Sequence, residues 1–171
     1  LNKIVDSQKH PDVWLLFSHI KKSRTDYIVE KATEMGVAKI MPILTDHTNT
    51  TRISKDRLQL HAIEAAEQCG TNFVPEVTDL KKLSDVLALW SKDRMIMFCD
   101  EAKKGSTEII KNNKNSWAIL IGPEGGFTDF ERKWLVSKNF VQNVSLGPRI
   151  LRADTAVVAA LTLWQSSIGD W

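Results

Sequence analysis

The chain has 171 residues, of which 43% are hydrophobic; this is enough for one compact core but too little for two domains of ordinary size. Its 23 Lys and Arg against 21 Asp and Glu leave a formal charge of +2, so composition alone predicts neither a nucleic-acid surface nor binding to an anionic membrane. No apolar run approaches the roughly 20 residues that a membrane-spanning helix needs, so we expect a soluble, cytoplasmic protein.

Apolar runs and helical patterns alternate along the whole chain, which is typical of an α/β fold with a mostly parallel sheet and helices on both faces. In chain order the expected elements are a strand at 13–17, a helix at 25–35, a strand at 38–44, a helix at 54–69, a short strand at 75–77, a short helix at 83–90, a strand at 95–99, a short helix near 107–111, a strand at 117–121, a helix at 128–138, a strand at 141–146 and a helix at 154–167.

Three local signals support the predicted helix boundaries. Gly36 stands where a glycine ends a helix, and Ser54 stands where a serine begins one. Thr128 and Glu131 have the spacing of a capping box, in which each side chain binds the backbone of the other. A polar stretch at 45–52 predicts a surface loop.

Neither the cysteines nor the histidines form a recognisable metal or redox motif. Cys69 and Cys99 are the two cysteines; they stand beside apolar residues and form no Cys-x-x-Cys pair, and the four histidines lie far apart in the sequence. We therefore expect reduced, structural thiols and no bound metal.

The first segment with the features of a ligand site is Gly122-Pro123-Glu124-Gly125-Gly126, between a buried strand and a helix. Its glycines let the backbone come close to a ligand, at the strand ends where α/β proteins usually bind one. Taken by themselves, the glycines are explained equally well by a tight strand-to-helix turn that binds no ligand. The pattern matches neither the dinucleotide nor the phosphate-loop motif, and the carboxylate of Glu124 suits a cation or hydroxyl groups better than phosphate.

The second such segment joins the last strand to the last helix. Arg149 and Arg152 flank a short apolar pair, and Asp154 with Thr155 is expected to cap the helix that follows. A single arginine-containing loop of this kind is more often a solvated turn. Two loops at the ends of strands that look adjacent favour a shared pocket.

Four segments in chain order resemble the SPOUT-superfamily methyltransferases of the RsmE type, which methylate a uridine in small-subunit ribosomal RNA. The segments are residues 23–26 with 31–37, 64–69, 122–127 and 146–152. The resemblance implies a SPOUT α/β knot, in which the C-terminal segment forms a trefoil knot, and a homodimer. It also implies S-adenosylmethionine as the cofactor and 16S ribosomal RNA in the small subunit as the partner.

The resemblance assigns roles to individual residues, with Arg152 facing the uridine as the candidate catalytic residue. The residues that it implies for cofactor binding are Cys99, Asp100, Ile121, Gly122, Pro123, Glu124, Gly125, Gly126, Leu146, Gly147, Ile150 and Leu151. The residues that it implies for RNA binding are Arg24, Glu67, Gln68 and Arg149.

The chain departs from the family pattern in three places. Asp154 stands where relatives carry a glutamate, a change that leaves a capping acid in place. Thr71 and Phe73 stand where the family commonly has an arginine after the Glu-Gln block, which weakens the case for RNA binding there. Residues 1–12 leave no room for the family's N-terminal β-barrel domain, so we assign these residues as a linker or remnant. We assign residues 13–171 as the methyltransferase domain. The first residue is a leucine rather than a methionine, which suggests a trimmed chain.

The resemblance leads to a mechanism that needs no metal. The methyl group of S-adenosylmethionine is already activated, so transfer to the uridine N3 atom chiefly requires correct placement. A guanidinium such as that of Arg152 lowers the free energy needed to remove the imide proton. Two alternatives stay open. One is an RNA-binding or nucleotide-binding domain that has lost catalysis, which the changed region of Thr71 and Phe73 keeps open; the other is a SPOUT enzyme acting on transfer RNA, which the Glu67-Gln68 block disfavours.

Overall fold

The computed structural model describes residues 10–18, 22–49, 52–103 and 115–171. The short helix expected near 107–111, and most of the expected linker at 1–12, lie outside the described residues.

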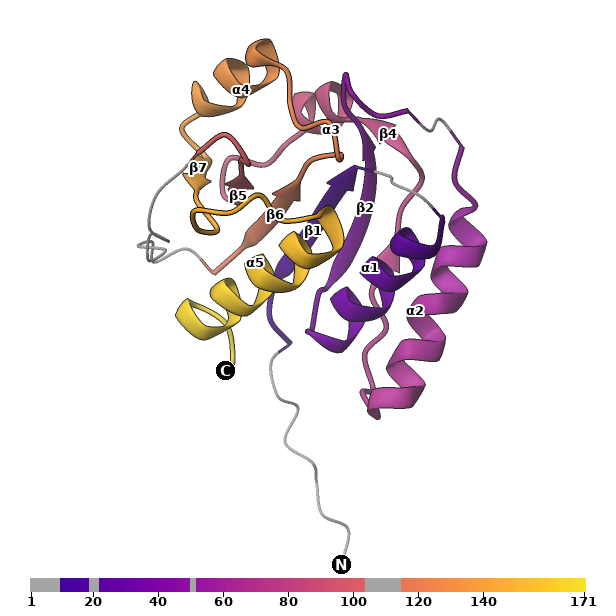
Figure 1. Cartoon of the computed structure of the whole chain (residues 1–171). Coiled ribbons are helices and arrows are strands. Elements are labelled where there is room, and N and C mark those ends of the chain that lie inside the picture. Colours follow the sequence, from indigo (N-terminus) through magenta and orange to yellow (C-terminus); the bar gives the residue numbers. More distant parts are fainter. Residues whose placement is uncertain (1–9, 19–21, 50–51, 104–114) are drawn as a thin grey trace, which may run out of the picture.

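One seven-stranded sheet forms the centre of the molecule, in the order β3-β2-β1-β6-β5-β7, with β4 also paired to β2 (Figure 1). Every strand pair is parallel, which confirms the predicted parallel sheet. The strands are β1 Val13–Ser18, β2 Lys39–Leu44, β3 Glu76–Val77, β4 Lys81–Lys82, β5 Met95–Cys99, β6 Trp117–Ile121 and β7 Val141–Val144.

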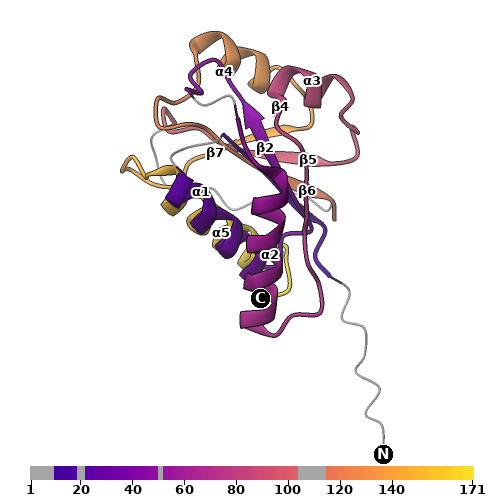
Figure 2. The ribbon, with the colours of Figure 1, turned by 90° about the vertical axis from the view of Figure 1, so that its right-hand side faces the viewer.

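Helices cover both faces of this sheet. One face carries α1 (Lys22–Glu34), α2 (Lys55–Cys69) and α5 (Ala153–Ser167), with α1 packed between the other two, and the opposite side carries α3 (Leu83–Ala88) and α4 (Asp129–Val136) (Figure 2). The right-handed rule for parallel crossovers accounts for this division, because the chain moves from β1 towards β3 in one direction and from β6 to β7 in the other.

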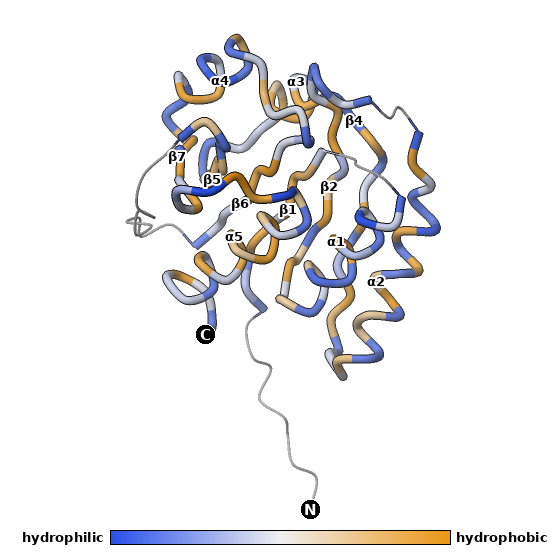
Figure 3. The backbone as a smooth tube through the Cα atoms, in the orientation of Figure 1, coloured by the Kyte–Doolittle hydropathy of each residue, from blue (hydrophilic) through white to orange (hydrophobic). Residues whose placement is uncertain are grey.

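The core follows from strands that are covered on both faces. Every residue of β5 and β6 is buried, so both strands are continuous apolar runs rather than alternating ones. Hydrophobic residues accordingly concentrate along the central strands (Figure 3). From the helices, α5 contributes the fully buried Trp164 and α1 contributes Ile28 and Val29.

The predicted helix ends are largely confirmed. Gly36 has a φ of 78°, in the left-handed region, just after α1. Ser54 accepts a hydrogen bond from the Arg57 backbone N–H, and Thr128 and Glu131 form both bonds of the capping box.

The structure corrects four details. The last strand ends at Val144 rather than at 146, and β4 was missed because two exposed lysines carry no strand signal. Asp154 does not cap α5: Arg152 holds the N-cap position without a side-chain bond, and Asp154 accepts the Thr155 N–H inside the first turn. Cys69, expected in a core-like setting, is exposed.

Replacing Ser54 with alanine is expected to lower the free energy of unfolding by about 1 kcal/mol, because the first turn of α2 loses its side-chain acceptor. Urea denaturation followed by circular dichroism measures the change. Ser54→Asp keeps an acceptor at the same place and is the matched control; equal stability of the alanine and aspartate variants would contradict the capping role.

Candidate active site

The topology brings three strand ends together at one edge of the sheet. Cys99 at the end of β5 pairs in register with Ile121 of β6 on one side and with Val144 of β7 on the other. The loops that follow these strands therefore leave the sheet side by side. The expectation that β6 and β7 are adjacent is wrong, because β5 lies between them. The Cys99 loop is therefore the middle wall of the site.

A pocket of about 330 Å³ opens between these loops and the start of α5. It is lined by Arg24, Cys99, Glu101, Ile121, Gly122, Pro123, Glu124, Ile150, Leu151, Arg152, Ala153 and Ala156. A smaller hollow beside it is lined by Cys99, Asp100, Glu101, Lys103, Leu146, Gly147, Arg149, Leu151 and Ala156. All the predicted cofactor residues except Gly125 and Gly126 thus line one of these two adjoining spaces.

Close packing explains two of the glycines in the 122–126 loop. A Cβ atom on Gly122 would lie 2.5 Å from the ring of Phe127, which is buried edge-on against Phe98. Gly126 has a φ of 68°, and a Cβ atom there would lie 1.9 Å from a carboxylate oxygen of Glu101. The loop is therefore pressed against the end of β5, which explains why Gly126 shapes the pocket without lining it.

The loop after β2 holds the glycine loop from its other side. The Nδ1 atom of His47 lies 3.0 Å from the carbonyl oxygen of Gly125 and 3.1 Å from that of Gly126. Because both partners are acceptors, Nδ1 carries the proton and donates. His47 was not predicted as a site residue, and an isolated histidine in a polar loop gave no signal for this role.

Arg132 of α4 joins the middle wall to that helix. Its guanidinium donates to Asp100 over 3.0 Å and also bonds to Glu101. Burial opposes the charge of Arg132, but the hydrogen bonds and the negative charges of these two acids raise its pKa above the ordinary value. A permanently charged arginine therefore fixes Glu101, a pocket residue that the sequence prediction missed although it directly follows Asp100.

Arg24, which the resemblance predicts to face RNA, lines the pocket. Its Nη1 atom is 2.6 Å from Glu124, and its Nε atom is 3.9 Å from Asp154. It therefore connects α1 to the glycine loop and to the first turn of α5. Deeper in the pocket, burial raises the pKa of the Cys99 thiol, so Cys99 stays neutral.

Arg152 and Arg149 lie at the site as predicted, both with exposed side chains. Among the described residues, none forms a hydrogen bond or ion pair with the guanidinium of Arg152. The backbone carbonyl of Arg152, in contrast, accepts a hydrogen bond from the Ala156 N–H over 2.7 Å. The backbone of Arg152 is thus fixed by α5 while its side chain stays available.

Glu67 and Gln68 are not brought to this pocket within one chain. They are exposed in the last turn of α2, which runs back from the carboxyl edge of the sheet to the amino edge. Phe73, one of the residues that depart from the family pattern, stacks on His10 with 3.8 Å between ring centroids. The role of Glu67 and Gln68 in RNA binding stays a prediction.

Within the described ranges, no group of three or more His, Cys, Asp or Glu side chains is placed to hold a metal ion. Over the same residues, no helix combines the length and the apolar character needed to cross a membrane.

A parallel α/β sheet with a pocket built from three strand-end loops defines a ligand-binding α/β domain. The sequence model of the RNA methyltransferase domain matches residues 7–165. The chain belongs to this RNA methyltransferase family.

Curated relatives agree with this assignment. The chain is 31% identical over 161 residues to ribosomal RNA small subunit methyltransferase E of Buchnera aphidicola subsp. Schizaphis graminum, covering 88% of this chain and 63% of the relative. It is 30% identical over 146 residues to the protein of that name from Rickettsia conorii, covering 83% of this chain and 59% of the relative. The chain thus spans less than two thirds of the length of these relatives.

Solved structures show the same fold. Ribosomal RNA small subunit methyltransferase E from Neisseria gonorrhoeae, bound to S-adenosyl methionine, superposes with a TM-score of 0.89 at 28% identity, over 98% of this chain and 71% of that one. A TrmH/SpoU tRNA modifying enzyme from A. aeolicus has a TM-score of 0.56 at 13% identity, over 93% of this chain and 76% of that one. The second likeness shows a shared fold alone.

Proposed function

We propose that this chain transfers a methyl group from S-adenosylmethionine to the N3 atom of a uridine in 16S ribosomal RNA of the small subunit. The observation that carries the proposal is the pocket at the ends of β5, β6 and β7 in a chain of the RNA methyltransferase family. The names of the relatives support the substrate, and the bound ligand of the Neisseria structure supports the cofactor. The homodimer, the cytoplasmic location and the C-terminal knot belong to the same proposal.

The residues of the pocket fit S-adenosylmethionine. A volume of about 330 Å³ lies in the range of pockets for small ligands. Apolar walls from Ile121, Leu151 and Ala156 suit an adenine ring. The carboxylates of Glu101 and Glu124 suit the ribose hydroxyls and the positive charges of the methionine part.

Each group of the chain has a simple task in this reaction. When bound, S-adenosylmethionine supplies an activated methyl group. The pocket loops would hold that group and the base in line, so that the bond from the methyl carbon to N3 forms as its bond to sulfur breaks and S-adenosylhomocysteine leaves. The N3 proton passes to solvent, and Arg152 would stabilise the negative charge that spreads over the uracil carbonyl oxygens. Because N3 lies on the Watson–Crick edge, the uridine has to be unpaired when it enters the site.

The proposal is tested by supplying S-adenosylmethionine with a labelled methyl group to small ribosomal subunits from cells that lack this modification, and mapping the labelled nucleotide. We expect one methylated uridine in 16S ribosomal RNA and no label in transfer RNA treated in the same way. Calorimetry with S-adenosylmethionine is run in parallel. RNA binding without any heat from S-adenosylmethionine would support the catalysis-free alternative and contradict the proposal.

Removing the His47 side chain is expected to weaken S-adenosylmethionine binding about fivefold, because the Gly125 and Gly126 carbonyls lose their donor and the loop loosens. Calorimetry on His47→Ala measures the affinity. His47→Asn places an N–H donor close to the position of Nδ1 and is expected to restore most of the binding; equal affinities of the two variants would contradict a hydrogen-bonding role.

A further inference from the structure

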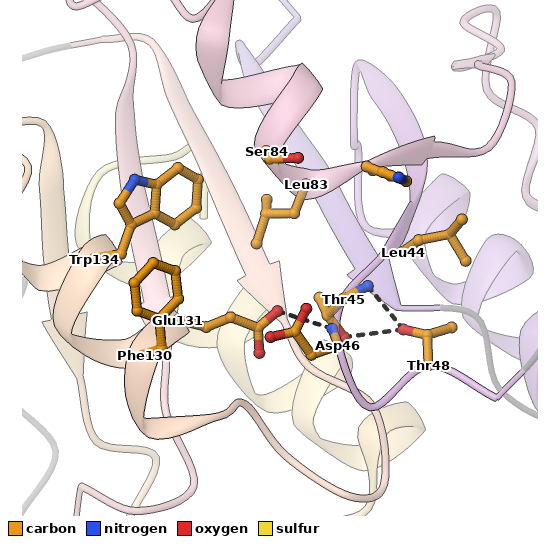
Figure 4. Close-up of a pocket in the computed structure, with 10 residues that line it drawn as sticks. Leu44, Thr45, Asp46, Thr48, Leu83, Ser84, Phe130, Glu131 and Trp134 are labelled. Atoms are coloured by element: carbon orange, nitrogen blue, oxygen red, sulfur yellow. Dashed lines mark hydrogen bonds between the residues drawn. The ribbon is translucent and has the colours of Figure 1, made fainter.

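A second cavity, of about 590 Å³, is lined by residues that do not line the pocket of the proposed active site. It lies between the end of β2, the start of α3 and the exposed side of α4 (Figure 4). Its lining residues are Leu44, Thr45, Asp46, Thr48, Lys82, Leu83, Ser84, Phe130, Glu131 and Trp134. Nothing in the proposed methyl transfer uses this cavity.

Two aromatic rings form one side of the cavity. Phe130 and Trp134 are four residues apart on α4, so they lie on the same helix face, and Figure 4 shows them opposite Leu44 and Thr48. The Phe130 side chain is 75% exposed although it is large and apolar. The Lys138 ammonium lies 4.4 Å from the centroid of the Trp134 ring, so one face of that ring is already occupied, and the partly buried ring also lines the cavity.

The polar groups of the cavity are held in place by hydrogen bonds. The buried carboxylate of Glu131 accepts the backbone N–H of Asp46 and that of Thr128, each over 2.9 Å, which joins the β2 loop to α4. The hydroxyls of Thr45 and Thr48 are 2.9 Å apart. The cavity is therefore preformed, with hydroxyl and carboxylate groups facing two rings.

This combination of rings and hydrogen-bonding groups fits a nucleobase. A base offers a flat face for stacking, and its edge carries both donors and acceptors for groups such as Thr48 and Ser84. Six of the ten lining residues are polar or charged, so hydrogen-bonding groups for the edge of a base lie around the two rings. The Asp46 carboxylate disfavours a phosphate inside, and the exposed Lys82 of the lining suits a phosphate outside.

The location links the cavity to the reaction. The turn that lines it with Asp46 and Thr48 also carries His47, which bonds to the glycine loop of the active site. We propose that this cavity binds an unpaired base of the substrate RNA near the methylated uridine, by stacking on Phe130 and Trp134. This subsite rests on the proposed RNA substrate.

The test measures binding of fluorescein-labelled single-stranded RNA octamers of uridine and of adenosine by fluorescence anisotropy, in the presence of S-adenosylmethionine. Phe130→Ala is expected to weaken binding of both about tenfold, since stacking accepts any base. Phe130→Tyr keeps the ring and is expected to bind as the unchanged protein does. Val136→Ala, an exposed apolar position on the same helix, is the matched control.

Calorimetry with S-adenosylmethionine separates failure of this subsite from failure of the proposed function. Phe130→Ala is expected to bind the cofactor normally, which also shows that it is folded. Normal cofactor binding with unchanged RNA affinity overturns the subsite alone. A change in the sedimentation mass of Phe130→Ala with unchanged RNA affinity also overturns it and indicates a contact between copies of the chain. No binding of cofactor or RNA by the unchanged protein overturns both proposals.

Discussion

Replacement of Arg152 by alanine is expected to lower the rate of methyl transfer about a hundredfold while the affinity for S-adenosylmethionine stays nearly unchanged. Arg152 presents a guanidinium at the pocket, and removing one group that stabilises developing negative charge typically has an effect of this size. The pocket itself persists, because the Arg152 carbonyl, which accepts the first bond of α5, remains in the variant. Single-turnover rates at saturating S-adenosylmethionine measure the first effect and calorimetry the second.

The pH dependence of the Arg152→Ala reaction separates charge stabilisation from a structural role. If the guanidinium lowers the free energy needed to remove the N3 proton, the rate of the variant without it depends more strongly on the hydroxide concentration, because hydroxide then has to remove that proton unaided. Its rate then rises more steeply with pH than that of the unchanged protein. Arg152→Lys keeps a positive charge without the planar fork and is expected to fall between the two. Equal losses of rate and of cofactor affinity would contradict the assignment.

The sheet could be predicted from the sequence because its central strands are buried on both faces. Such strands are continuous apolar runs, as at Met95–Cys99 and Trp117–Ile121, and their register follows once they pair side by side. Strand order could not be predicted in the same way. Nothing in the residues of β7 shows that it pairs with β5 rather than with β6, and this placement makes Cys99 and Glu101 the middle of the site.

The candidate site was predictable where the backbone imposes a constraint on residue type. Glycines at 122 and 126 mark places where a Cβ atom does not fit, and that restriction is visible in the sequence. The groups that hold the walls of the pocket come from distant segments. His47 follows β2 and Arg132 belongs to α4, and each contacts the site through side-chain bonds that have no local signature. The resemblance to a known family predicted the residues of the pocket, whereas the side chains that hold its walls were found only in the structure.

Gly126→Ala is expected to weaken S-adenosylmethionine binding at least tenfold and to lower the free energy of unfolding by about 1 to 3 kcal/mol, the range for a residue held in a strained backbone conformation. Its φ of 68° disfavours any side chain, and the added Cβ atom would lie 1.9 Å from a carboxylate oxygen of Glu101. To make room, Glu101 has to move, and its bond to Arg132 is then lost. The middle wall of the pocket and the glycine loop are therefore disturbed together.

Gly125→Ala is the matched control for this prediction, because the neighbouring glycine has an ordinary φ and its added Cβ atom would lie 3.4 Å from His47. We expect its affinity for S-adenosylmethionine to stay within about twofold of the unchanged protein, since the contact is close to ordinary van der Waals distance. Adding Glu101→Ala to Gly126→Ala removes the clash but not the backbone strain. The double variant is therefore expected to regain part of the stability while binding stays weak, because Glu101 itself lines the pocket. Full recovery of cofactor binding in the double variant would show that Glu101 only fills space and makes no contribution to holding the ligand.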